Sequence, residues 1–166
     1  IAALLMSVAV PGYRDFARNA AVSQAAASFV QSAHLARGNA MRRSRVTVLA
    51  LRDTAQGWTG GWIVYTDLNN NLSYDAQVDE LLQQQAPLAD GVQVDLANNA
   101  SGTLREGYLR FSAAGFPRNA NNGVTGGSIS FVLTDARSVR VFYTQSGRIR
   151  RCNVGAADCP NPESST

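Results

Sequence analysis

Hydrophobic residues follow two different periods along the chain, and the period changes near residue 46. An apolar run extends from Ile1 to Val10, and apolar or small residues then recur every three or four positions from Tyr13 to Ala40. This spacing is typical of an amphipathic α-helix. The pattern predicts one long helix over residues 1–45, with an apolar part at 1–10 that breaks at Pro11.

Beyond residue 46, short alternating or apolar runs are separated by turn-forming residues, as expected of β-strands. Strands are predicted at 46–51, 62–66, 80–85, 92–96, 108–112, 128–133, 139–144 and 148–152. The long segment 113–127 is rich in Gly and Asn and predicts a mobile loop. No helical pattern separates consecutive strands, which favours antiparallel pairing. The predicted fold class is therefore α+β: a long N-terminal amphipathic helix packed on a mostly antiparallel β domain, residues 46–166.

Composition and charge refine this picture. A chain of 166 residues allows one domain with a real core and is too short to expect two. All fifteen positive charges are arginines, which suit phosphate or carboxylate ligands, although the base composition of a genome can produce the same bias. Residues 53–104 contain seven acidic residues and no arginine, whereas residues 136–157 contain five arginines and no acidic residue. We expect one acidic and one basic side.

The two cysteines, Cys152 and Cys159, lie in a loop rich in Gly and Ala. Too few other ligands are nearby for a metal site, so the spacing favours a local disulfide. Such a bond indicates an oxidising compartment, while two free thiols are the alternative.

The densest positive charge lies just before these cysteines, in "VRVFYTQSGRIRRC". Ser-Gly between two alternating runs predicts a β-hairpin. Strand alternation places Arg148 and Arg150 on one face, about 7 Å apart, which is comparable with neighbouring phosphates on one nucleic-acid strand. A two-residue turn would set Tyr143 opposite Arg150, and a three-residue turn would put Phe142 and Arg140 on that face instead; the sequence leaves both registers open.

Four motifs are distinctive: "VPGYRDF" at the expected helix break, "LARGNAMRR" near the helix end, "GWIVYTD" followed by "DELL", and the late "GRIR". Together they resemble the GspH/FimT group of type IV pilin-like proteins over nearly the whole chain. The resemblance implies a minor pilin or pseudopilin lacking its extreme N-terminus. Its helix would anchor in the inner membrane, facing the periplasm, and later pack against other major and minor pilins in a cell-surface pilus.

The resemblance also implies a function for the arginines, because FimT-like members carry a C-terminal Gly-Arg-x-Arg motif associated with DNA binding in natural transformation. The implied partner is double-stranded DNA, contacted at its phosphates with little sequence preference. Three alternatives remain: a GspH-like structural pseudopilin of a type II secretion system, arginines that only protect a strand edge from aggregation, and a soluble calcium-dependent adhesin. The implied DNA-binding residues are Gly147, Arg148, Arg150 and Arg151, with Arg137 and Arg140 in second place.

Other chemistry is weakly indicated. The segment "DLNNNLSYDAQVDE", residues 67–80, imitates the first half of a calcium loop, but Leu72 and Val78 replace its glycine and glutamate, which favours an Asx-rich turn. His34 lies within the predicted helix, away from cysteines and carboxylates, and is interpreted as structural. No catalytic motif is present, so we expect a protein that is not an enzyme and has no cofactor or metal.

Overall fold

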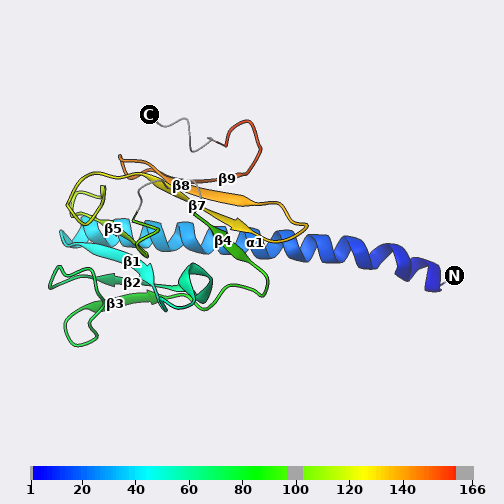
Figure 1. Cartoon of the computed structure of the whole chain (residues 1–166), viewed down its shortest axis with the longest axis horizontal. Coiled ribbons are helices and arrows are strands. Elements are labelled where there is room, and N and C mark those ends of the chain that lie inside the picture. The colour runs from blue at the N-terminus through cyan, green and yellow to red at the C-terminus, as the bar shows by residue number, and fades with distance from the viewer. Residues whose placement is uncertain (1, 97–102, 160–166) are drawn as a thin grey trace.

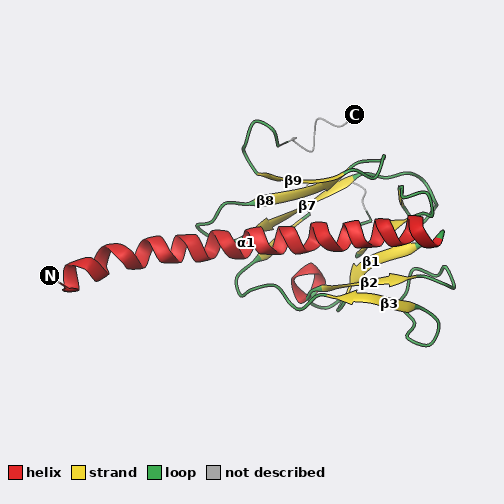
Figure 2. Cartoon of the chain, turned by 180° about the vertical axis from the view of Figure 1, so that it is seen from behind, coloured by secondary structure: helices red, strands yellow, loops and turns green. Residues whose placement is uncertain are grey.

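The computed structural model describes residues 2–96 and 103–159, with side chains from Tyr13 onward. It contains one long helix, α1 (Ala2–Arg43), a short 3₁₀ helix, η1 (Gly57–Gly60), and two antiparallel sheets. Both sheets lie on the same side of α1, which crosses in front of them in Figure 2. Its N-terminal part continues well beyond the sheets (Figure 1).

The first sheet has five strands in the order β3-β2-β1-β5-β6, and the second has four in the order β4-β7-β8-β9. The strands of the first sheet are β1 (Thr47–Leu51), β2 (Trp62–Thr66), β3 (Glu80–Gln84), β5 (Tyr108–Phe111) and β6 (Pro117–Arg118). Those of the second are β4 (Gln93–Asp95), β7 (Gly127–Val132), β8 (Val139–Tyr143) and β9 (Ile149–Asn153).

The predicted fold class is confirmed, and each predicted strand is present with small changes at its ends. The predicted helix break at Pro11 is wrong, because α1 runs through Pro11 without interruption. A proline inside a helix removes one backbone hydrogen bond but has a helical φ, so the helix can continue with a local distortion. The loop predicted at 113–127 contains β6, and its backbone bonds include Thr125 N–H to the Pro117 carbonyl (3.2 Å).

One stripe of α1 forms the centre of the core. Its residues are Val22, Ala26, Phe29, Ala33, Ala36 and Ala40, all at most 1% exposed. The alanines let the sheets approach the helix closely, and Phe29 fills the space where the two sheets meet. Its ring lies 5.4 Å from that of Trp62 in the first sheet and 5.9 Å from that of Phe131 in the second. The helix and both sheets therefore share one core.

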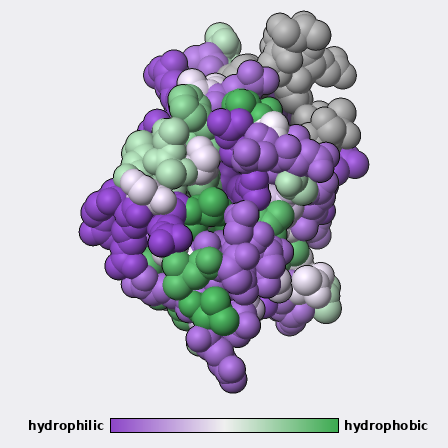
Figure 3. All heavy atoms as spheres, turned by 90° about the vertical axis from the view of Figure 1, so that its left-hand side faces the viewer, coloured by the Kyte–Doolittle hydropathy of each residue, from purple (hydrophilic) through white to green (hydrophobic). Residues whose placement is uncertain are grey.

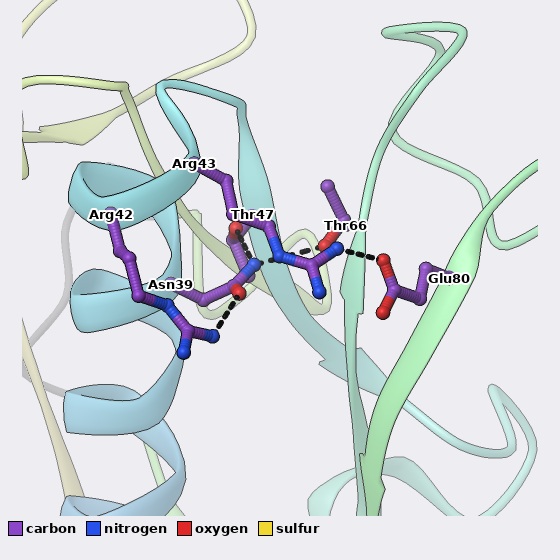
Figure 4. Close-up of polar contacts among 6 residues, drawn as sticks. All are labelled: Asn39, Arg42, Arg43, Thr47, Thr66 and Glu80. Carbon is purple, nitrogen blue, oxygen red and sulfur yellow. Dashed lines mark hydrogen bonds and ion pairs between the residues drawn. The ribbon is translucent and has the colours of Figure 1, made fainter.

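The end of α1 is fixed by its backbone and by side chains. Ser44 has φ +54°, and the N–H of Arg45 donates to the carbonyl of Ala40 (3.2 Å), which is a Schellman-type ending. Figure 4 shows buried Asn39 donating to the hydroxyls of Thr47 and Thr66, at 3.0 and 2.9 Å.

Two arginines complete this junction. Arg42 donates to the side-chain oxygen of Asn39 (3.2 Å), and Arg43 forms an ion pair with Glu80 on β3 (Figure 4). The last turn of α1 is thus tied to three strands of the first sheet. These contacts give the basic residues at the helix end a structural role, in addition to their favourable interaction with the helix dipole.

The surface is mixed in character. Seen from the end at which α1 stops, hydrophobic residues form groups bounded by hydrophilic ones (Figure 3). Exposed apolar residues of this kind are ordinary on folded proteins. Within the described residues, no helical segment is both long and apolar enough to cross a membrane.

Candidate nucleic-acid interface

Strands β8 and β9 form the predicted arginine hairpin, and its turn resolves the register. Thr144 and Arg148 face each other, with the Thr144 N–H donating to the Arg148 carbonyl (3.0 Å). Residues 145–147 form the turn between them, and Gly147 takes the left-handed conformation, with φ +81°. Phe142 therefore lies opposite Arg150, which is the register expected of a three-residue turn.

The register sends alternate residues of β9 to opposite faces of the second sheet. Ile149 is buried in the core beside α1, paired with Tyr143. Arg148 and Arg150 lie on the opposite face and are exposed. Within the described residues, neither guanidinium forms an ion pair or a hydrogen bond. As far as the described residues are concerned, both guanidinium groups are open to an anion from solution.

The turn is held against the rest of the domain at Gly147, which is buried. A Cβ atom there would lie 2.4 Å from the Gly115 carbonyl oxygen and 2.7 Å from Arg37 Nε. Arg37, on α1, donates from this Nε to the same carbonyl (3.0 Å). Only glycine combines the positive φ with so close an approach. The helix thus fixes the position of the arginine pair, a contact that the sequence alone did not suggest.

The far end of β9 is fixed by the predicted disulfide, which is present between Cys152 and Cys159. The ring begins within β9 at Cys152, which pairs with Arg140 in the sheet register. The exposed arginines are therefore anchored on both sides, by the docked turn and by the disulfide ring.

The other candidate arginines are not brought together with this pair. Arg151 is exposed, but strand alternation places it on the α1 side of the sheet, with Ile149. Arg140 shares the face of Arg150, yet it is only 7% exposed and donates from Nε to Ser130 Oγ (3.2 Å). Arg137 is exposed in the segment before β8, where its backbone N–H donates to Asn19 of α1 (2.8 Å).

The segment 67–79 contains Asx turns, in which the side-chain oxygens of Asn69, Asn71 and Asp75 each accept the backbone N–H two residues later. Two buried aspartates make further bonds to its backbone. Asp67 is buried, and its carboxylate accepts the backbone N–H groups of Asn71 (3.2 Å) and Leu72 (3.0 Å). Asp79, also buried, accepts those of Leu68 (2.9 Å) and Asp75 (2.8 Å). Each carboxylate is thus bonded to two backbone N–H groups of the segment. Among the residues that the structure describes, no group of three or more His, Cys, Asp or Glu could hold a metal ion.

Comparison with known proteins places this fold in a family. The sequence model of type II transport protein GspH matches residues 25–147, well over half of the chain. The chain belongs to the GspH family. This confirms the resemblance to the GspH/FimT group of type IV pilin-like proteins. The GspH match ends at Gly147, so it includes the turn of the hairpin and none of the arginines of β9.

Solved structures with the GspH-like fold include two crystal forms of the type IV minor pilin FimU from Pseudomonas aeruginosa PAO1. The P21 form is 20% identical with a TM-score of 0.57, covering 78% of this chain and 86% of that one. The P65 form is 19% identical with a TM-score of 0.56, covering 78% and 90%.

The minor pseudopilin EpsH of the Vibrio cholerae type 2 secretion system is also similar. It is 18% identical with a TM-score of 0.54, covering 81% of this chain and 98% of that one. At such identities the likeness concerns the fold alone. The similar structures include both a pilus protein and a secretion-system protein. No curated protein matches the sequence.

Proposed function

We propose that this GspH-family chain is a minor pilin of a type IV pilus that binds double-stranded DNA through Arg148 and Arg150, in support of DNA uptake. One observation carries the proposal: two exposed arginines share a face of a strand that is anchored at both ends. The anchoring lowers the entropy cost of using these side chains on a ligand.

The expected contact is with phosphates. Residues two apart on a strand are separated by about 7 Å, so each guanidinium can engage a different phosphate on one DNA strand. Arginine offers a planar fork that donates two hydrogen bonds to one phosphate. The described residues of the hairpin include no recognition helix, so we expect little sequence preference.

The protruding part of α1 supports a place in a filament. Tyr13 and Phe16 are 74% and 70% exposed. Packing against the helices of other major and minor pilins would remove these rings from water. Before assembly the subunit would lie at the inner membrane with its β domain in the periplasm, where the disulfide is stable. After assembly it would be part of the cell-surface pilus.

A second function is a structural pseudopilin of a type II secretion system. The description of the matching family as type II transport protein, together with the similarity to EpsH, favours this role. In that case Arg148 and Arg150 serve as charges on an edge strand, where they discourage edge-to-edge pairing. Neither role requires catalysis, and we predict that the protein is not an enzyme.

The test is a titration of a short mixed-sequence DNA duplex by fluorescence anisotropy at 50 and 200 mM salt. Two phosphate contacts contribute a slope of about −1.8 to the dependence of log affinity on log salt, which lowers affinity about twelvefold over this range. The double variant Arg148→Gln, Arg150→Gln should show a salt dependence that is weaker by this slope of about 1.8. It should also bind the duplex at least tenfold more weakly than the wild type at 50 mM salt.

The matched control is Arg45→Gln, Arg52→Gln, which removes the same number of charges from exposed positions away from the hairpin. It should retain most of the affinity, and circular dichroism should show that both variants are folded. Equal weakening in both double variants would mean that binding follows net charge rather than the hairpin. Absence of wild-type binding at 50 mM would favour the pseudopilin.

A further inference from the structure

Two arginines of the first sheet lie opposite each other, and neither has a counterion among the residues that the structure describes. Arg110 on β5 pairs directly with Arg118 on β6 in the sheet register. Like charges in this position destabilise a sheet. The two ion pairs among the described residues, Arg18–Asp135 and Arg43–Glu80, involve neither of them. Two positive charges in this arrangement destabilise the folded protein unless an anion neutralises them.

The surroundings increase this cost. Arg110 is only 7% exposed, and the Nε atoms of both arginines are buried without a hydrogen-bond partner. Both guanidinium groups donate to Asn122, whose side-chain oxygen accepts from Arg110 (3.0 Å) and whose carbonyl accepts from Arg118 (2.9 Å). These acceptors are neutral. A buried cation is strongly stabilised by a charged partner, which neither arginine has within the described structure.

A hollow of about 460 Å³ opens beside Arg110. Its lining comes from Val46, from residues 70–72 of the Asx-rich turn, and from Ala120 and Asn122 of the turn after β6. Asn70, Asn71 and Asn122 supply amide groups to its lining. The other described lining residues, Val46, Leu72 and Ala120, are apolar, so Arg110 is the only charged residue among the described residues that line the hollow. Such an arginine is suited to a carboxylate or phosphate, because guanidinium matches both in charge and geometry.

We propose that this hollow binds an oxyanion, a carboxylate or a phosphate group, with Arg110 as its principal contact and Arg118 as the second positive charge. The site belongs to the first sheet, whereas Arg148 and Arg150 belong to the second. The proposal is therefore independent of DNA binding by the hairpin. The variant Arg148→Gln, Arg150→Gln should bind small anions in this hollow as the wild type does.

The direct test is an NMR titration of the full 166-residue chain with sodium phosphate and sodium acetate, at ionic strength held constant with sodium chloride. Saturable shifts are expected for the backbone amides of residues 70–72 and 120–122 and for Arg110 Nε. Saturation by both anions indicates a general oxyanion site, and saturation by one identifies its chemical class. Shifts that do not saturate, or that chloride reproduces, would overturn the proposal.

A second test introduces a carboxylate beside Arg110 by substitution, in place of an added anion. Asn122 has φ +62°, which Asp tolerates, so Asn122→Asp should put a carboxylate against Arg110 with little backbone change. We expect the melting temperature to rise by about 2–4 °C and the affinity for added anion to fall at least tenfold. Asn121→Asp is the control, because it adds the same charge on the same turn outside the hollow.

Arg110→Gln should abolish anion binding in a folded protein. Removal of a buried side chain also affects folding, so the result for Arg110→Gln is interpreted together with that for Asn122→Asp. The latter variant leaves Arg110 and Arg118 in place. If Asn122→Asp and Asn121→Asp change stability and anion affinity equally, the hollow is not an anion site.

Discussion

Two buried tyrosines show how much depends on the partner of a single hydroxyl. Tyr143 ends β8 of the arginine hairpin and lies in the core, and its hydroxyl is 3.1 Å from that of Thr103. Tyr65, on the outer face of the first sheet, is fully buried, and its hydroxyl has no hydrogen-bond partner in the described structure. The two side chains share their chemistry and burial but differ in hydrogen bonding.

Replacement by Phe should therefore have opposite consequences at neutral pH. Tyr143→Phe leaves Thr103 without its buried partner and should cost about 1 kcal/mol in the free energy of unfolding. Tyr65→Phe removes a polar group that has lost its hydration, and should be neutral or stabilising by up to about 1 kcal/mol. Urea unfolding of both variants measures the difference. Equal destabilisation would mean that the Tyr65 hydroxyl has a partner after all.

These two tyrosines and Tyr108 make stability depend on pH in alkaline solution. Burial raises the pKa of Tyr65 and of Tyr143, and burial together with Glu106 raises the pKa of Tyr108 to about 12. Above pH 10 the unfolded chain loses these protons while the folded chain keeps them, so stability falls between pH 10 and 12. In Tyr65→Phe this fall should be shallower.

The residues that the sequence did not reveal act through tertiary contacts. Asn39 looks like an ordinary polar position of a helix, but it is 3% exposed and joins α1 to two strands. Arg110 looks like a polar position of an alternating strand, and its relation to Arg118 depends on the short strand β6. No local pattern encodes either relation, because each partner comes from a distant part of the chain.

At the scale of elements, the clearest predictions came from strong periodicity. The stripe of α1 and the alternation of the main strands reflect burial against a core, which repeats at every turn or every second residue. β6 has only two residues, too few to show a period. Proline is unfavourable in the interior of a helix, yet α1 passes through Pro11. The register of the hairpin depended on the length of its turn, which Ser-Gly alone did not determine.

The disulfide ring is an element whose contribution can be measured directly. Closing the ring between Cys152 and Cys159 stabilises the fold by about 2.5 kcal/mol in the loop-entropy estimate. The variant Cys152→Ser, Cys159→Ser should lose up to this amount in urea unfolding. Its DNA affinity should fall a few-fold, because the end of β9 is then less constrained.

Wild-type protein treated with dithiothreitol is the control for the serine substitutions and should behave in the same way. If stability falls but DNA affinity does not, the docked turn at Gly147 is sufficient to position Arg148 and Arg150. If neither changes, the ring is a surface feature without influence on the strand.

At the scale of the whole molecule, α1 has two parts with different surroundings. Up to Ala17 the described side chains of the helix are exposed, and these residues extend away from the sheets (Figure 1). Contacts with the β domain begin at Arg18, which pairs with Asp135 (3.4 Å), and Asn19, which accepts the N–H of Arg137 (2.8 Å). Val22 is the first residue of the helix in the core.

This division predicts that the protruding part of α1 does not stabilise the domain. Deletion of residues 1–16 should change the melting temperature by less than about 2 °C and leave DNA affinity per subunit unchanged. Deletion of residues 1–24 also removes Val22, whose burial contributes about 1.5–3 kcal/mol, and should lower the melting temperature by at least about 5 °C. Differential scanning calorimetry of both forms provides the comparison. A large loss of stability in the shorter deletion would show that the protruding segment packs on its own domain, and its exposed Tyr13 and Phe16 would then be poor candidates for contacts between subunits.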